Sequence, residues 1–91
     1  MKVKFFATYR NITNRKETDI PAPPDIRALL AWLGETYGEA IRKELLTPDG
    51  ENIGSNAIIL VNGRNIQFLE GIDTTLSESV TISIFPVVAG G

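Results

Sequence analysis

The sequence contains no cysteine and no histidine among its 91 residues. The chain therefore has no thiolate nucleophile, no disulfide and neither of the two commonest transition-metal ligands. Histidine general bases and Ser-His or Cys-His pairs are excluded as well. The acidic residues show no pairing typical of acid/base catalysis or of a metal site; they include Asp19, Asp25, Glu35 and Asp73. An enzyme could still use Asp, Glu or Lys, but most chemical options are closed, and we expect no bound metal or cofactor.

The sequence also lacks an excess of basic residues and any long apolar run. Nine lysines and arginines against eleven aspartates and glutamates give a formal net charge of −2, and the isoelectric point is about 5.0. Proteins that bind nucleic acids usually carry a basic surface, so no nucleic-acid partner is expected. No window approaches the ~20 apolar residues of a membrane span, and the first residues do not resemble a secretory signal. The sequence therefore predicts a cytoplasmic protein with no membrane partner.

The first half of the chain predicts two strands and a helix. Side chains alternate over residues 2–9, which predicts a strand whose buried face carries Val3, Phe5, Ala7 and Tyr9. Residues 10–15 supply turn chemistry, and residues 17–20 predict a short strand that completes a hairpin. Asp25 is expected to cap a helix with five apolar residues on one face: Ile26, Leu29, Leu30, Leu33 and Tyr37. Gly38 is expected to end this helix, and residues 39–46 predict further helical turns.

The second half of the chain predicts three more strands of the same domain. Residues 57–61 form an apolar run typical of a central strand, and Asn62-Gly63 is a strong hairpin signal before a brief strand at 64–66. A single turn is expected near Phe68-Leu69. Residues 80–85 predict the last strand, with Val80, Ile82 and Ile84 facing the helix. This order indicates an α+β fold, the β-grasp (ubiquitin-like) roll, in which a mixed sheet packs on one main helix.

The chain ends on two glycines, Gly90 and Gly91. We expect residues 1–86 to form the β-grasp domain and residues 87–91 a flexible tail. Two glycines form a thin, pliant tether, and the α-carboxylate of Gly91 is ionised at neutral pH. Adenylation by a partner would convert it into an acyl-adenylate open to attack by sulfur or an amine. The dipeptide alone is equally compatible with an end of no functional consequence.

Four segments in register resemble one family: Lys2–Ala7, Leu60–Arg64, Asp73–Leu76 and Phe85–Gly91. Together they resemble the MoaD/ThiS family of sulfur carriers, most closely the small subunits of molybdopterin synthase, over essentially the whole chain. The chain departs from many relatives at Ser77-Glu78, where Gly-Asp is common, at Val87, where a second proline is common, and in a longer loop over residues 46–55.

The resemblance implies a carrier that works with two enzymes. An ATP-dependent adenylyltransferase related to ubiquitin-activating enzymes would adenylate Gly91, so that ATP is used by the partner and not bound by this chain. Sulfur would then convert the end into a thiocarboxylate. The tail would insert into the large synthase subunit, in a heterotetramer, and give its sulfur to precursor Z. Gly90 and the preceding tail residues would contact these partners: Pro86, Val87, Val88 and Ala89.

A docking surface is expected on the sheet beside the tail. If Val3 and Phe5 face the helix, Phe6 must point outward, and the same alternation turns Phe85 outward. The first and last strands are neighbours in a β-grasp sheet, so the two rings should lie close together and suit partner binding. Arg64, directly after the hairpin turn, could contact an acidic partner surface or be a solvated turn residue.

Three functions are compatible with these features. The leading one is a thiocarboxylate carrier, for molybdopterin or for thiamine, cysteine or another thiolated product. The second is a protein modifier, in which a lysine amine attacks the activated Gly91 and leaves an isopeptide bond. The third is an interaction module with an inert tail.

Overall fold

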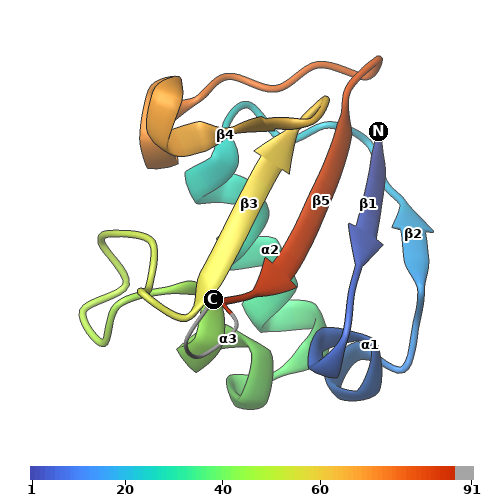
Figure 1. Cartoon of the computed structure of the whole chain (residues 1–91), viewed down its shortest axis with the longest axis vertical. Helices are drawn as coiled ribbons and strands as arrows, with labels where there is room; N and C mark the ends of the chain where they lie inside the picture. The colour runs from blue at the N-terminus through green and yellow to red at the C-terminus, as the bar shows by residue number, and fades with distance from the viewer. Residues whose placement is uncertain (88–91) are drawn as a thin grey trace.

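The structure is a computed structural model that describes residues 1–87. Its elements follow in the order β1 (Lys2–Phe5), α1 (Thr8–Thr13), β2 (Glu17–Asp19), α2 (Ile26–Tyr37), α3 (Glu39–Leu45), β3 (Ala57–Val61), β4 (Arg64–Asn65), the 3₁₀ turns η1 (Ile66–Phe68) and η2 (Gly71–Asp73), and β5 (Thr81–Pro86). The strands form one sheet in the order β2-β1-β5-β3-β4 (Figure 1). The predicted α+β, β-grasp fold is confirmed.

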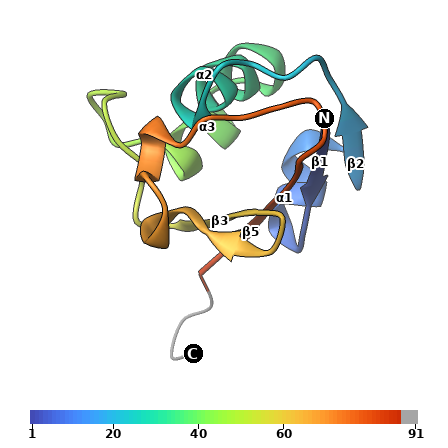
Figure 2. The ribbon, with the colours of Figure 1, turned by 90° about the horizontal axis from the view of Figure 1, so that it is seen from above.

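The two chain-terminal strands lie side by side in the middle of the sheet. β1 and β5 are parallel, while the other neighbouring pairs are antiparallel. Helices α2 and α3 lie together on one side of the sheet, and no helix within residues 1–87 covers the opposite face of β3 and β5 (Figure 2). The core therefore lies between the sheet and the helices α2 and α3. On the opposite face of β3 and β5, the outward-pointing side chains of the strands form the surface.

Helix α2 follows the pattern that the sequence predicts. The Asp25 carboxylate accepts a hydrogen bond from the Ala28 N–H at 2.9 Å and so caps the first turn. Four of the five predicted core residues are fully buried at 0% exposure: Ile26, Leu29, Leu30 and Leu33. Gly38, at φ +93°, donates its N–H to the Gly34 carbonyl and ends the helix, and α3 begins directly after it. Tyr37 is half-buried.

The prediction of one strand over residues 2–9 and a turn over 10–15 was wrong, because the chain turns at Ala7 and forms α1. The Tyr9 N–H donates to the Phe6 carbonyl at 3.1 Å, and Ala7 is exposed instead of facing the helix. Tyr9 is still fully buried, because it reaches the core from α1, where its hydroxyl donates to the Asn56 carbonyl at 3.0 Å. Apolar residues still occur at every second position across this turn, so the alternation in the sequence gives no sign of where the strand ends.

The second half of the chain differs from prediction in smaller ways. Residues 66–73 contain two 3₁₀ turns, not one. Strand β5 begins at Thr81, so Val80 lies half-buried before the strand. The strand also includes Pro86, which pairs with Ala57 at the end of the ladder. Proline fits there because the end of a ladder can lack one N–H donor.

We expect Ala7→Gly to stabilise the protein. Ala7 lies at φ +53° and ψ −131°, the first central position of a type II′ turn that favours glycine. Glycine relieves this backbone strain, but it also raises the conformational entropy of the unfolded chain, which offsets part of the gain. The net effect should be a free energy of unfolding higher by about 1 kcal/mol. Urea unfolding followed by circular dichroism measures it. Ala31→Gly, in the exposed face of α2, is the control and should lower stability by about 1 kcal/mol; a loss at both positions would contradict the strain at Ala7.

Glu78 joins the segment before β5 to the first strand and to the segment that leads into α2. Its carboxylate accepts a hydrogen bond from the Ala22 N–H at 2.6 Å and lies 3.4 Å from the Met1 nitrogen. The hydrogen bond from Ala22, followed by the contact with the Met1 nitrogen, lowers the pKa of Glu78. Glutamate at this position, one of the departures from related sequences, thus has a structural role.

The Glu78 contacts should make stability depend on pH. Because the folded-state pKa lies below its ordinary value of 4.5, the stabilisation is complete above that pH and is lost as pH falls through the folded-state pKa. We expect the urea midpoint of Glu78→Gln to lie below that of the wild type at pH 7 and to approach it under acid conditions. Glu35→Gln, which removes an exposed carboxylate of α2, is the control. A Glu78→Gln difference that persisted unchanged in acid would contradict this role of the charge.

Candidate functional site

A shallow apolar groove of about 470 Å³ lies on the helix-free face of the sheet. It is lined by residues from the turn after β1 and from the strands β3 and β5: Phe6, Ala7, Leu60, Ser83, Phe85 and Pro86. The polar atoms of Ser83 are the main exception to an apolar lining. A groove this open suits an apolar side chain of a partner better than an enclosed small molecule.

Phe6 and Phe85 meet in this groove, as the predicted strand order requires. The Phe6 N–H donates to the Ile84 carbonyl at 3.1 Å, which extends the β1–β5 pairing by one residue. The two ring centroids are 5.9 Å apart with an interplanar angle of 88°, an edge-to-face contact. Each ring is half-buried, partly by the other. The pair is therefore fixed by backbone pairing and by its own contact before any partner arrives.

Leu60 and Arg10 belong to the site but were not recognised from the sequence. Leu60 was part of a continuous apolar run, yet Ile59 and Val61 face the core, so that Leu60 turns into the groove. Arg10 was assigned to a turn. On α1 its Nε donates to the Phe5 carbonyl at 2.9 Å, and its guanidinium carbon lies 5.3 Å from the centroid of the Phe6 ring. This cation–π contact helps to hold the Phe6 ring in place.

The groove adjoins the segment that leads into the glycines. Phe85 and Pro86 line it, and the next residue, Val87, is 51% exposed while its N–H donates to the Asn56 carbonyl at 2.9 Å. Val88, Ala89, Gly90 and Gly91, predicted as site residues, lie outside the residues that the structure describes. A partner on the groove would thus meet the last described residues of the chain.

Arg64 does not line the groove. It is exposed on β4, where it pairs with Val61, and β3 and β5 lie between β4 and the strand that leads to Phe6. A partner-binding role for Arg64 stays a prediction and would need a partner that reaches across the sheet.

Two of the acidic residues that the sequence raises, and the buried Tyr9, have structural roles. Asp25 caps α2, and Asp73 pairs with Arg27 at 3.2 Å. Burial, followed by the nearby Glu44 carboxylate, raises the pKa of Tyr9 far above its usual range, which keeps the hydroxyl a hydrogen-bond donor. Trp32 packs edge-to-face on Tyr37, with centroids 6.1 Å apart, in line with the packing role that the sequence predicts.

A second cavity, of about 410 Å³, lies between the loop after α3 and the η1 and η2 turns, and none of the described residues that line it has a titratable side chain. Over residues 1–87, no three acidic side chains gather where they could hold a metal ion. None of the helices described is long and apolar enough to cross a membrane. The apolar groove that includes Phe85 and Pro86 is therefore the candidate functional site.

Comparisons with known proteins agree with this geometry. The sequence model of the ThiS family matches residues 3–91. Small archaeal modifier protein 3 of Haloferax volcanii is 31% identical over 97 aligned positions, which cover 100% of this chain and 98% of that protein. The solution structure of small archaeal modifier protein 1 from Methanosarcina acetivorans is 32% identical, with a TM-score of 0.85, and the match covers 99% of this chain and 94% of that one.

A third relative is a solved structure from Pyrococcus furiosus named "Putative molybdopterin converting factor, subunit 1". It is 27% identical, with a TM-score of 0.75, and the match covers 96% of this chain and 95% of that one. The family match over almost the whole chain agrees with the segments that suggested it: the first strand, the hairpin after β3 and the end of β5. The chain belongs to the ThiS family, and its fold is that of the ubiquitin-like ThiS/MoaD sulfur carriers.

Proposed function

We propose that the carboxylate of Gly91 is the reactive group of this protein and that it carries sulfur. A carboxylate oxygen attacks the α-phosphate of ATP on a partner adenylyltransferase, and pyrophosphate leaves. A sulfur donor then displaces AMP from the acyl-adenylate, which leaves a thiocarboxylate on Gly91. The carrier needs only to present its tail, in keeping with a chain that has no cysteine and no histidine.

The observation that carries this proposal is the position of the apolar groove. Phe85 and Pro86 belong both to the groove and to the strand that continues into the glycines. An adenylyltransferase seated on Phe6 and Phe85 would thus hold the root of the tail, and the remaining residues would reach its active site. Binding energy gained at the rigid sheet would position the reacting carboxylate, as remote contacts do in other group transfers.

For the sulfur acceptor we propose precursor Z of molybdopterin. The chain would act as the small subunit of molybdopterin synthase, in a heterotetramer with a large subunit that supplies the catalytic residues. The likeness to the Pyrococcus furiosus structure over 96% of this chain supports this assignment. Supply of sulfur to thiamine, cysteine or another thiolated product is the alternative use of the same thiocarboxylate.

A protein modifier is the second candidate function. It is favoured by the likeness to small archaeal modifier protein 3, which covers 100% of this chain. In this case a lysine amine of a target protein displaces AMP or sulfide from the activated Gly91 and forms an isopeptide bond. The two functions share the adenylation step and differ in the nucleophile, so one experiment on the tail tests both and the product separates them.

Intact mass spectrometry tests the carrier function. After incubation with the adenylyltransferase, ATP and a sulfur donor, we expect a mass gain equal to the exchange of one oxygen for sulfur. A variant that lacks Gly91 should show no gain, because its terminal carboxylate, now on Gly90, ends one residue short of the position where the reaction takes place. Lysine-linked adducts on other proteins of a cell extract would favour the modifier. No change in mass and no lysine-linked adduct, under conditions in which an established carrier of the family reacts, would contradict both.

Substitutions in the groove test docking. We expect Phe85→Ala to raise the KM of the adenylyltransferase for this protein about 10- to 100-fold, as loss of a central interface aromatic does. Phe6→Ala should have a similar effect. Phe68→Ala is the matched control, since Phe68 is 82% exposed on η1 and does not line the groove. Equal KM values for all three variants and the wild type, measured as ATP–pyrophosphate exchange, would refute docking on the groove.

A further inference from the structure

The charges of this chain are strongly segregated along the sequence. Five of the nine basic residues fall within the first sixteen positions, and no acidic residue precedes Glu17: Lys2, Lys4, Arg10, Arg15 and Lys16. The other four basic residues share the rest of the chain with all eleven acidic residues. The protein therefore has one basic region, over residues 2–16, although its net charge is slightly negative and the rest of the chain is acidic.

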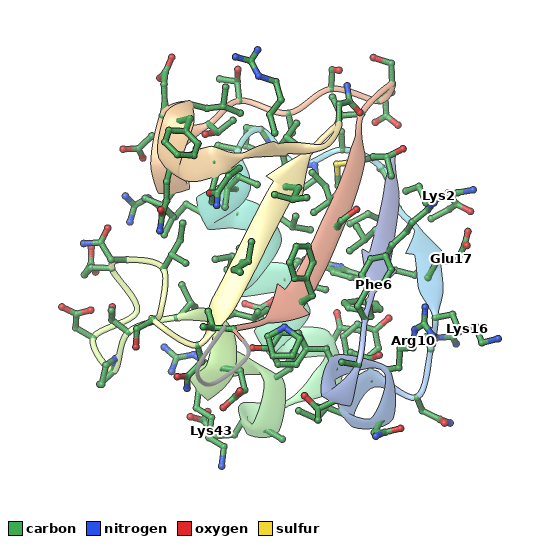
Figure 3. All side chains as sticks on the ribbon, viewed as in Figure 1. Lys2, Phe6, Arg10, Lys16, Glu17 and Lys43 are labelled. Carbon is green, nitrogen blue, oxygen red and sulfur yellow. The ribbon has the colours of Figure 1, made fainter. Side chains whose placement is uncertain are left out.

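The fold places this basic region beside the apolar groove. Lys4 pairs in register with Ser83, a groove residue, and points to the same face of the sheet. Arg10 lies against the Phe6 ring, and the Lys16 carbonyl accepts a hydrogen bond from the Phe5 N–H at 2.9 Å. Figure 3 shows Phe6, Arg10 and Lys16 on the β1–β2 side of the sheet, with Lys43 away from them on α3. We call Lys4, Arg10 and Lys16 the basic rim.

The basic rim makes no salt bridge within the described chain. The salt bridges of residues 1–87 join Lys2 to Glu17 at 3.2 Å, Arg27 to Asp73 and Glu51, Arg42 to Glu39, and the Met1 nitrogen to Glu78. None of them includes Lys4, Arg10 or Lys16. Glu17 of β2 lies opposite Lys4 in the strand register and Asp19 faces the same side, but the salt bridge of Glu17 is to Lys2. Lys4, Arg10 and Lys16, without a salt bridge within residues 1–87, can thus pair with carboxylates of a partner.

Arg10 connects the two parts of this surface. Its Nε is occupied by the Phe5 carbonyl, and its planar group lies over the Phe6 ring, so the side chain is held in place. Its terminal nitrogens make no hydrogen bond to residues 1–87. A guanidinium fixed in this way can bind a carboxylate through two parallel N–H groups with little further loss of side-chain freedom.

We infer that the partner that docks on this groove presents carboxylates to the basic rim next to an apolar side chain that fills the groove. The inference rests on the proposed function, because the partner is the adenylyltransferase that acts on Gly91. Opposite charges at the rim of an apolar contact accelerate association and reject partners with the wrong charge. The basic rim would give the chain a means to select its activating enzyme.

Association kinetics with the adenylyltransferase test the inference. Lys4→Glu/Lys16→Glu should lower the association rate constant about tenfold at low ionic strength and make it nearly independent of salt, whereas the wild-type rate should fall steeply as salt is added. Lys43→Glu is the control for a charge reversal at an exposed lysine, and it should leave both rate and salt dependence close to the wild type. Arg10→Lys, which keeps the charge and loses the planar group, should mainly raise the dissociation rate.

The outcomes separate this inference from the proposed function. Association that is insensitive to salt and to Lys4→Glu/Lys16→Glu, with Gly91 still adenylated, would overturn the role of the basic rim alone. Failure of the wild type to be adenylated would overturn the proposed function. Loss of self-association or of binding to a DNA oligonucleotide in Lys4→Glu/Lys16→Glu, with unchanged association to the enzyme, would assign the basic rim to a second copy or to nucleic acid and would also overturn the inference.

Discussion

The parallel pairing of β1 with β5 is the constraint on which the rest of the structure depends. Two parallel neighbours cannot be joined by a tight turn, so the chain between them must leave the sheet, cross one face and return. Helices α2 and α3 make this crossing and bury the inner residues of both strands. The pairing also determines what appears on the outer face, because Phe6 follows β1 and Phe85 lies near the end of β5.

Much of the fold could be predicted because single residues determine the backbone geometry of their own segment. Asp25 as a cap, Gly38 at the end of α2 and Asn62-Gly63 after β3 each impose a backbone geometry that neighbouring residues cannot override. Helix α1 could not be predicted, because it depends on contacts made far along the chain. Tyr9 enters the core from a helix only because the Asn56 carbonyl and the Glu44 carboxylate are there to receive its hydroxyl.

The site was predictable to the extent that it follows from strand alternation. Phe6 and Phe85 could be paired from the sequence because outward positions on adjacent strands must meet. Arg10 could not, since its contact with Phe6 requires the turn at Ala7 that brings α1 back beside the strand. The Phe6–Phe85 pair of the groove therefore follows from strand alternation. The Arg10 contact depends on Ala7, a single residue at a positive φ angle.

The central strand pair also determines when the protein can fold. Lys2 pairs with Thr81 and Phe5 with Ile84, so the middle of the sheet joins positions almost a chain length apart. Contacts of such high sequence separation form late, and during synthesis β1 has no central partner until β5 has emerged from the ribosome. A shortened or stalled chain would expose β1 with an open edge and lack the aromatic pair. The groove is complete only when Phe85 and Pro86 are in place. A chain that can dock on its partner has therefore been synthesised at least to the end of β5, directly before the tail.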